Sequence, residues 1–424
     1  MMRTALMTAL ILAATTPVLA APKSVKADSR ILAAAEAVRD DQLKLLETVV
    51  NIDSGTGDVA GGRKVAALLA ERLRAMGAAI EMVPAEIPGL PDNLVATFTG
   101  SGKGRVLLIG HLDTVFEPGT VSRWPFRIDG DRAYGPGVSD EKGGVVQAVF
   151  ALQILKDAGF RDFKTITYLI ETSEERGSPG TRALISRLLK DADVELNLEP
   201  GDAPDVITVW RKGSNTFYID VKGRAAHAGV APQDGRNAAD ELIHQLQAVA
   251  PFPKTGDGMT VNLTLMSAGS RYNIIPEDAS AAINVRVREK AQAEQVAQAL
   301  EAGARAPLIP DTKVTIRRET SFPPLQNNAS TDALADRAEA IYAGLGLKLG
   351  RGGNGGASQS ALAADAGVPA LDGLGPVGGG FHSDKEYLDL KSLTPRLYLL
   401  TRLIMDYGKS PPPPMNSETG KPSR

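Results

Sequence analysis

The chain has 424 residues, of which 43% are hydrophobic and 23% charged, and its formal net charge is −3. These values are ordinary for a globular protein of two or three domains, and they lack the basic excess of a nucleic-acid-binding surface. The absence of cysteine excludes disulfides, thiolate metal sites and cysteine nucleophiles, so a bound metal must be held by His, Asp and Glu.

Residues 1–21 are predicted to be a secretory signal peptide. Arg3 precedes an apolar run that ends in small residues before Ala20 and Ala21, which is the order of such a signal. A membrane anchor is the alternative, but the run is shorter than the roughly 20 residues that a membrane span needs. We therefore expect a periplasmic or secreted protein, with residues 411–424 as a disordered, Pro-rich tail.

The segment from residue 22 to 212 alternates helices and strands. Residues 29–50, 62–76 and 143–159 have helical spacing of apolar residues, and residues 93–98, 105–113, 164–171 and 192–200 have the composition of strands. This alternation predicts an α/β fold with a mostly parallel sheet. The Gly-rich residues 99–104 lack the spacing of a nucleotide-binding loop and are predicted to form a hairpin turn between the two flanking strands.

The order changes over residues 213–322. Strand and helix patterns there follow the order β-α-β-β-α-β, which is that of a ferredoxin-like unit. After residue 322 helices and strands alternate again, and the chain ends on an amphipathic helix with Pro395 in its first turn. We therefore predict one domain made of residues 22–212 and 323–410, with a second domain, 213–322, inserted into it.

Candidate metal ligands occur in two of the first loops. His111 ends a hydrophobic strand, and Asp113 lies two positions further on, on the same side of an extended chain. Asp113 could hydrogen-bond one ring nitrogen and leave the other for a metal, although a local cap without metal is the alternative. Asp140 lies between glycines that permit close approach of a ligand; a dinucleotide loop is disfavoured because its glycine spacing is missing.

Further candidates follow later strands. Glu174 and Glu175 end the strand 164–171, Glu199 ends the strand 192–200, and His382 lies in a Gly-rich loop. The carboxyl ends of strands in an open α/β sheet face the ligand crevice, and adjacent carboxylates there need a cation to ionise together. An exposed acidic turn is the alternative for the two glutamates. Two histidines and three carboxylates suit a pair of divalent ions, zinc first, which would bring the pKa of a shared water toward ~7.

Seven segments carry a resemblance to a known family over residues 30–408: "GHLDTVF", "GDRAYGPGVSDEKGG", "EERGSPGTR", "HAGVAP", "NIIP", "FHSDKEYLDL" and "RLYLLTRLIMD". The chain resembles the di-zinc exopeptidases and deacylases that include exported, folate-hydrolysing glutamate carboxypeptidases, succinyl-diaminopimelate desuccinylase, acetylornithine deacetylase and aminoacylase. The resemblance implies a zinc-exopeptidase-like catalytic domain, and it makes residues 213–322 a lid and dimerisation domain.

The resemblance also implies roles for individual residues. One zinc ion would be held by His111, Asp140 and Glu199, and the other by Asp140, Glu175 and His382. Glu174 would be the general base, Asp113 would orient His111, and a cis peptide would follow Asp140.

Three residues of the inserted domain take roles by the same resemblance. His227 would reach the partner subunit's active site and stabilise the oxyanion, with help from Asn273, so a homodimer is expected. A surface loop histidine is the alternative for His227. Arg286 would bind the substrate carboxylate bidentately, whereas His244 is interpreted as structural or solvated.

Two departures concern the substrate pocket. Ala357 and Ser358 stand where close relatives have Thr and Asp, and Arg211 and Lys212 are placed differently from the basic residues of the family. The expected function is release of a C-terminal amino acid, glutamate first, from a small acyl or peptidyl donor, with no nucleic-acid partner and no membrane association of the mature form. The alternatives are an N-acyl-amino-acid deacylase or dipeptidase with another leaving group, a non-catalytic binding protein, and a nucleotide-binding protein.

Overall fold

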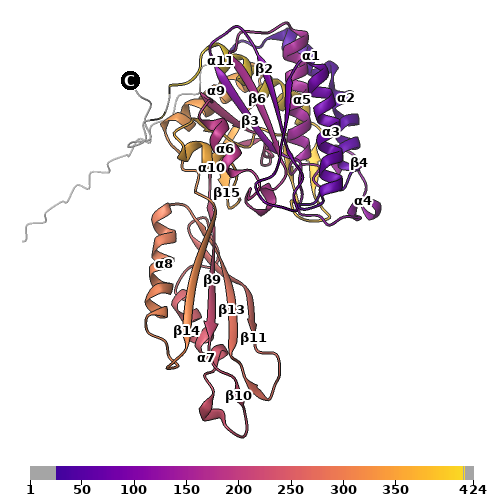
Figure 1. Ribbon diagram of the computed structural model, residues 1–424. Helices are drawn as coiled ribbons and strands as arrows, with labels where there is room; N and C mark the ends of the chain where they lie inside the picture. The colour runs from indigo at the N-terminus through magenta and orange to yellow at the C-terminus, as the bar shows by residue number, and fades with distance from the viewer. Residues whose placement is uncertain (1–24, 414, 416–424) are drawn as a thin grey trace, which may run out of the picture.

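The structure, a computed structural model, describes residues 25–413 and 415. The predicted signal peptide lies outside the described residues, as does the predicted tail apart from residues 411–413 and 415. Figure 1 shows a larger unit around a central sheet and a smaller, elongated unit below it. Within the described part, none of the helices combines the length and the apolar character needed to cross a membrane.

The central sheet has six strands. Across the sheet their order is β1 (Ala79–Val83), β2 (Asn93–Thr99), β6 (Thr165–Glu171), β3 (Arg105–His111), β7 (Val194–Asn197) and β16 (Ala370–Leu371). β6, β3, β7 and β16 are mutually parallel, whereas β2 runs antiparallel to β6 and β1 antiparallel to β2. The predicted α/β class with a mostly parallel sheet is confirmed, and the carboxyl ends of the parallel strands meet at one edge.

The predicted hairpin between β2 and β3 is wrong. β6 lies between these strands and pairs with both of them. The intervening loop bonds instead to the segment before β6, through Gly100 N–H to the Lys164 carbonyl at 3.1 Å and Gly102 N–H to the Phe163 carbonyl at 2.9 Å. The prediction failed because a turn signal depends only on neighbouring residues. The strand β6 is rich in β-branched residues, and both its faces are buried only in the middle of the sheet.

Helices cover both faces of the sheet. The larger core includes α1 (Ser29–Ala37), α2 (Arg39–Val50), α3 (Val59–Ala75), α5 (Lys142–Asp157), α9 (Ala329–Gly344) and α11 (Leu393–Lys409). On the opposite face lie α6 (Arg182–Leu189) and α10 (Ser360–Asp365). The helical region predicted over residues 29–50 is thus two helices.

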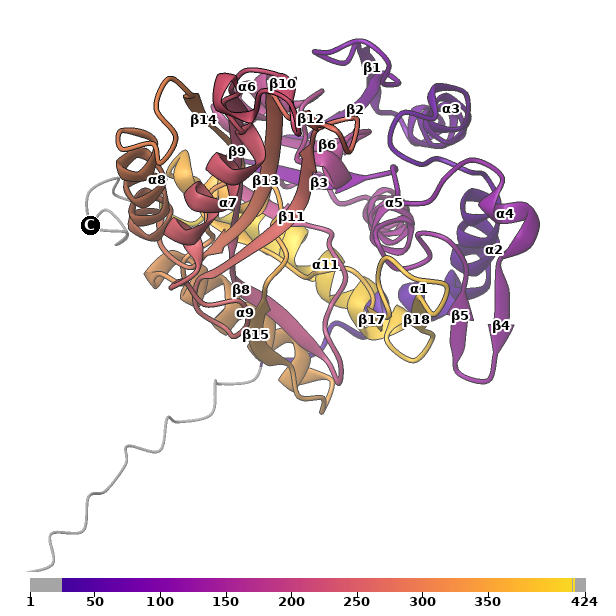
Figure 2. The ribbon, with the colours of Figure 1, turned by 90° about the horizontal axis from the view of Figure 1, so that it is seen from below.

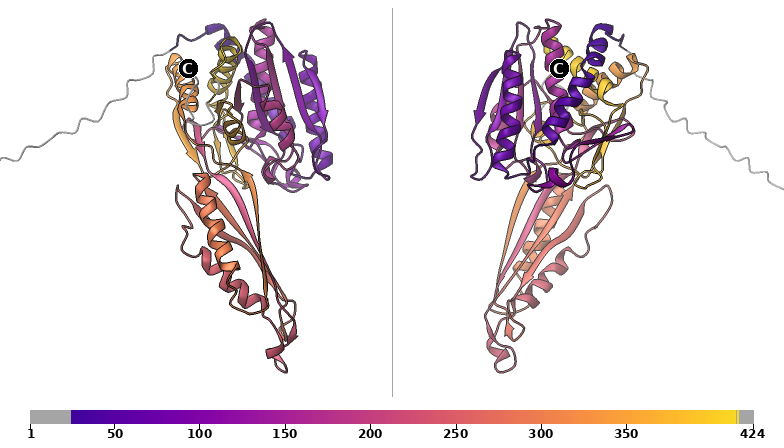
Figure 3. Two further views of the ribbon diagram at one scale, coloured as in Figure 1. Left: turned by 60° about the vertical axis from the view of Figure 1, so that its left-hand side comes forward. Right: turned by 90° about the vertical axis from the view of Figure 1, so that its right-hand side faces the viewer.

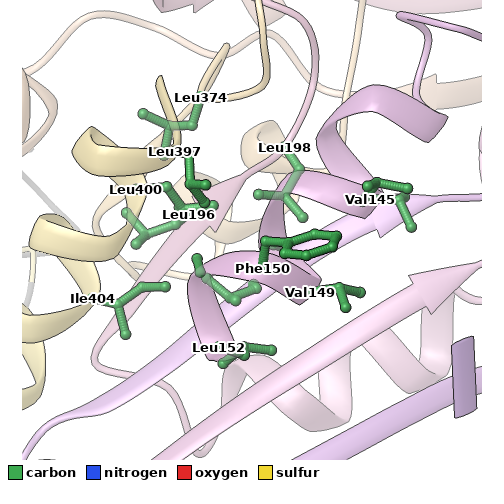
Figure 4. Close-up of a cluster of buried hydrophobic side chains, with 14 of the residues drawn as sticks. Val145, Val149, Phe150, Leu152, Leu196, Leu198, Leu374, Leu397, Leu400 and Ile404 are labelled. Carbon is green, nitrogen blue, oxygen red and sulfur yellow. The ribbon is translucent and has the colours of Figure 1, made fainter. Parts of the chain in front are cut away.

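The helix α5 is the centre of the larger core, because nearly every side chain on it is buried. Phe150 of α5 packs with Leu196 of β7 and with Leu397 and Leu400 of α11 in one apolar cluster (Figure 4). Burial of each such side chain contributes about 1.5–3 kcal/mol. The last helix therefore fastens the C-terminal part of the chain to the N-terminal part.

Residues 213–322 form the smaller unit. Its elements are β9 (Gly213–Lys222), α7 (Ala238–Leu246), β11 (Thr260–Ala268), β13 (Asp278–Val287), α8 (Lys290–Ala304) and β14 (Lys313–Phe322). The strands form an antiparallel sheet in the order β11-β13-β9-β14, the ferredoxin-like arrangement. The unit has its own apolar core, which includes Phe217, Leu242, Ile283 and Val296, and it projects as a narrow arm from the larger unit (Figure 3).

Short elements complete the fold. β4 (Arg127–Asp129), β5 (Arg132–Tyr134), β18 (Tyr387–Asp389) and β17 (Gly378–Gly379) form a small sheet (Figure 2). β8 (Val206–Arg211) pairs with β15 (Gly350–Asn354), β10 (Ala226–His227) pairs with β12 (Ile274–Ile275), and α4 (Thr120–Arg123) is a single turn. The loop that precedes α5 and the loop that precedes β18 both reach the carboxyl edge of the central sheet.

Candidate metal centre

All five predicted metal ligands lie at the carboxyl edge of the central sheet. His111 is the last residue of β3, and Glu199 follows the end of β7 by two residues. The prediction that Glu174 and Glu175 end a strand is wrong. The strand β6 ends at Glu171, and the two glutamates lie in a 3-10 turn over Glu174–Arg176.

The five residues form two groups that share one carboxylate. His111 Nε2 lies 3.3 Å from Asp140 Oδ1 and 3.7 Å from Glu199 Oε1. His382 Nε2 lies 3.3 Å from Asp140 Oδ2 and 3.2 Å from Glu175 Oε2. In each group the ligand atoms lie within 4.8 Å of one another. The two oxygens of Asp140 thus face different histidines, as a bridging carboxylate between two cations requires.

The donor atoms fit divalent metal ions. His111 Nε2 is buried and has no hydrogen-bond partner among the described residues, although Asp140, Glu141 and Glu199 all lie within 4 Å of it. A cation between the ring nitrogen and these carboxylates would satisfy all of them. Imidazole and carboxylate ligands without thiolate suit first-row divalent metals.

The electrostatics of the site point the same way. Burial raises the pKa of Glu175 to about 7, although its hydrogen bond with His382 opposes this shift. Burial also raises the pKa of Glu174, and the neighbouring Glu199 and Glu175 add to this rise. Hydrogen bonds to Asp140 and Glu175 raise the pKa of His382 to about 10. Without a metal, these closely spaced groups therefore bind protons, and a bound cation would displace those protons.

The orientation of His111 differs from the prediction. Its Nδ1 lies 2.9 Å from the backbone carbonyl oxygen of Asp113 and 3.5 Å from Asp113 Oδ1. The shorter contact places the ring proton on Nδ1, where it is donated to the carbonyl, and leaves Nε2 bare for a metal. The prediction assumed that residues 111 and 113 lie on the same side of an extended strand. The strand β3 ends at His111, so its alternation of side chains does not extend to Asp113.

The carboxylate of Asp113 holds the two glutamates instead. It accepts the backbone N–H of Glu174 at 3.1 Å and that of Glu175 at 3.4 Å. It also accepts the hydroxyl of Thr56 at 2.6 Å. Asp113 therefore fixes both the histidine, through its carbonyl, and the turn that presents Glu174 and Glu175.

A cavity of about 550 Å³ opens beside the two groups, and residues of both units line it. Glu174 reaches it from the larger unit, and Arg286 reaches it from β13 of the smaller unit. Arg286 is half-buried and donates Nε–H to Asn284 Oδ1 at 3.1 Å. Its two terminal nitrogens have no hydrogen-bond partner among the described residues, so both can donate hydrogen bonds to an anion in the cavity.

His227 and Asn273 do not join this cavity within one chain. His227 lies in β10 at the far end of the smaller unit (Figure 1), and both side chains are exposed. His227 Nδ1 accepts N–H from Gly229 and Val230, each at 3.1 Å. In the neutral ring the proton is therefore on Nε2. His244 lies half-buried in α7 and has no place in the site.

Sequence reasoning gave no role to two buried side chains at this site. Glu141 accepts the N–H of His111 at 3.2 Å. The peptide bond between Asp140 and Glu141 is cis, which confirms the predicted cis peptide. Arg211 binds Asp372 at 2.7 and 2.8 Å and Glu199 Oε2 at 3.4 Å. Only the position next to Asp140 could have singled out Glu141, and no local signal pairs Arg211 with Asp372.

The two departures from the family pattern lie only partly at the cavity, because Ser358 and Lys212 do not line it. Ala357 lines the cavity, together with Asn354 and Gly356. Ser358 is buried away from it and donates its hydroxyl to Asp372 at 2.5 Å. Arg211 also lines the cavity, but its guanidinium is engaged by Asp372 and Glu199.

Known proteins share this sequence pattern and fold. Residues 107–406 match the pattern of Peptidase family M20/M25/M40. Carboxypeptidase G2 of Pseudomonas sp. (strain RS-16) is 35% identical over 379 residues, which cover 88% of this chain and 91% of that protein. A tripeptidase of Staphylococcus aureus has a TM-score of 0.71 at 22% identity, over 88% of this chain and 99% of that one. A dinuclear metal-binding M20 peptidase of Bacillus subtilis has a TM-score of 0.64 at 16% identity, over 88% and 99%.

Proposed function

The chain belongs to peptidase family M20/M25/M40, and we propose that this peptidase is a two-zinc exopeptidase that releases a C-terminal glutamate from a small acyl or peptidyl donor. The observation that carries the proposal is the shared Asp140, with a histidine and a second carboxylate on each side of it. Glu174 and Arg286 line the cavity beside this centre.

The side chains divide the work of amide hydrolysis. Zinc ions held by the two groups would supply a water of lowered pKa and a polarised carbonyl. Glu174 belongs to neither group, so its carboxylate is free to take a proton from the attacking water and pass it to the leaving amine. The hydrogen bond from its backbone N–H to Asp113 keeps that carboxylate beside the centre.

Arg286 accounts for cleavage at a chain end. Its free guanidinium nitrogens can bind a carboxylate bidentately, and they face the same cavity as Glu174. A terminal carboxylate meets this requirement, whereas a peptide bond within a chain does not. The glutamate side chain is expected from the sequence resemblance, and the polar residues Ser214, Thr216 and Asn284 of the cavity wall can hydrogen-bond it.

Oxyanion stabilisation by His227 requires a homodimer in this proposal, because β10, which carries His227, lies at the end of the smaller unit that is remote from the larger unit (Figure 1). The edge strand β11 supports a second copy, since Leu265 and Met266 are 69% and 49% exposed there. Mixing a Glu174→Gln chain with a His227→Ala chain tests this arrangement. Mixed dimers would then contain one complete site and regain activity, and no recovery would refute a role in the partner's site.

Export to the periplasm or the medium is also part of the proposal, and it rests on the pattern of residues 1–21. Cell fractionation of the full chain and of a chain that lacks these residues tests it. Retention of both in the cytoplasm would contradict export.

The central test uses the purified mature chain. We expect two zinc ions per subunit by elemental analysis and release of glutamate from N-acyl-glutamates. A metal-loaded protein that hydrolyses no amide, or an active protein that binds no metal, would contradict the proposal.

A second candidate is an N-acyl-amino-acid deacylase or dipeptidase with another leaving amino acid. The observation that favours it is the cavity wall at Asn354, Gly356 and Ala357, where Ala357 stands in place of the expected Thr. Rates on N-acyl-glutamate and N-acyl-alanine with the same acyl group separate the two. A preference for alanine would select the second candidate.

A further inference from the structure

Glu386 lies four residues after His382 and has no part in either group of ligands. Its side chain is nevertheless only 1% exposed. Its position follows from strand pairing, because Tyr387 of β18 pairs with Tyr134 of β5. This register places Glu386 beside the start of the loop over residues 135–141, which carries Asp140.

Three backbone donors of that loop converge on the Glu386 carboxylate. Oε1 accepts the N–H groups of Ser139 at 2.9 Å and Asp140 at 3.0 Å, and Oε2 accepts the N–H of Gly137 at 3.3 Å. These three N–H groups have no other acceptor among the described residues. A carboxylate that accepts two or three backbone N–H groups is a strong anchor for them.

Other contacts also hold this loop, because Val138 is buried in the core and the Glu141 carboxylate accepts the N–H of His111. Among the described residues, however, the other hydrogen bonds of the backbone of residues 135–140 are local, from Val138 N–H to the Gly135 carbonyl and from Lys142 N–H to the Gly137 carbonyl. Gly137 has a φ of +70°, a conformation that glycine adopts readily and that the loop sequence does not enforce. The bonds from Glu386 link the Asp140 loop to the loop that carries His382.

We propose that Glu386 is the positioning residue for Asp140, and that its carboxylate fixes the backbone of residues 137–140 before any metal binds. Asp140 contributes one oxygen to each group of ligands, so its placement sets both groups together. Glu386 itself belongs to neither group and does not line the cavity. The inference rests on the proposed role of Asp140 as a bridging ligand, but its first test needs neither metal nor substrate.

That first test is amide hydrogen exchange of the metal-free mature chain. In Glu386→Gln, an NH₂ group replaces one of the two accepting oxygens. This group faces a backbone N–H, so the two donors cannot form a hydrogen bond with each other. We expect peptides over residues 135–142 to exchange about 2- to 10-fold faster, the loss of about one net hydrogen bond, while peptides over β3 and the smaller unit stay unchanged. Unchanged exchange over 135–142, or faster exchange throughout the protein, would overturn the proposal.

The second test is zinc affinity, measured by chelator competition. Loss of a partner that orients a ligand weakens metal binding about 10–100-fold, so Glu386→Gln should weaken both zinc sites by this factor. Saturating zinc should then restore kcat, with KM unchanged. Equal affinity in the variant and the wild type would refute the positioning role, while absence of glutamate release by either protein would refute only the proposed function.

A matched control comes from the smaller unit. Glu241 is also fully buried, and its carboxylate accepts the Ile309 N–H at 2.7 Å, far from the metal centre. Glu241→Gln should leave zinc affinity and exchange over residues 135–142 unchanged. If Glu386→Gln does not fold, Glu386→Asp, which keeps the charge but shortens the side chain, is judged by the same two measurements.

Discussion

Replacing Glu174 and Glu175 separately by glutamine tests the division of labour in the active site. The two residues are neighbours in one turn, and Asp113 holds both backbone N–H groups, so each variant is the other's control. Glu175 Oε2 lies 3.2 Å from His382 Nε2 within a ligand group, whereas Glu174 is in neither group. Glutamine keeps the shape of each side chain and removes its charge and basicity.

The expected magnitudes differ between the variants. Glu174→Gln should keep two zinc ions and lose about 10²–10⁴-fold in kcat, the usual contribution of a general base; a 10³-fold loss equals about 4 kcal/mol of activation free energy. Glu175→Gln leaves His382 and Asp140 as the only protein ligands of its group. Its zinc affinity should fall at least about 100-fold. Residues that only orient a ligand lower metal affinity by about 10–100-fold when they are replaced, and loss of a ligand itself should cost at least as much.

Zinc content by elemental analysis, zinc affinity by chelator competition and kcat at saturating zinc separate the outcomes. Equal zinc loss in both variants would refute the assignment of separate roles. A Glu174→Gln enzyme with more than about a tenth of the wild-type kcat at full zinc occupancy would refute the general-base role, since the loss would fall below the expected range.

Three further predictions follow from the same structure. Arg286→Lys should lower kcat/KM for an N-acyl-glutamate about 10–100-fold, because a lysine cannot bind a carboxylate bidentately. An unchanged kcat/KM would refute a role of Arg286 in substrate binding. Zinc affinity should rise by at least about tenfold per pH unit between pH 6 and 8, because His382, whose pKa is raised to about 10 by Asp140 and Glu175, must lose a proton to bind metal. Glu175, whose pKa burial raises to about 7, should steepen the rise below pH 7, and a flat profile by chelator competition would contradict this prediction. Burial raises the pKa of Glu171 from 4.5 to about 7, so about 3 kcal/mol of stability is present below pH 4.5 and is lost as the pH rises through 7. Urea unfolding of the metal-free protein should therefore find Glu171→Gln more stable than the wild type at pH 8 and equal to it at pH 4, and equal stability at both pH values would contradict the burial effect.

The sequence by itself determined which residue types stand at the ends of strands. Hydrophobic periodicity and β-branched runs are local properties of the chain, so the α/β pattern and the β-α-β-β-α-β order of residues 213–322 could be predicted. His111, Glu199 and His382 follow such runs or lie in Gly-rich loops, and the absence of cysteine left His and carboxylates as the possible ligands.

Only the tertiary structure decided how these residues meet. The position of β6 between β2 and β3 depends on which strands pair, and a local turn signal gave the wrong neighbour. The carboxylate of Asp113 accepts the N–H of Glu174, 61 residues away, and Glu386 accepts the N–H of Ser139, 247 residues away. Such contacts arise from sheet register and loop packing over long distances in the chain. A local pattern specifies which side chain is present, whereas the hydrogen bonds that orient it depend on the whole fold.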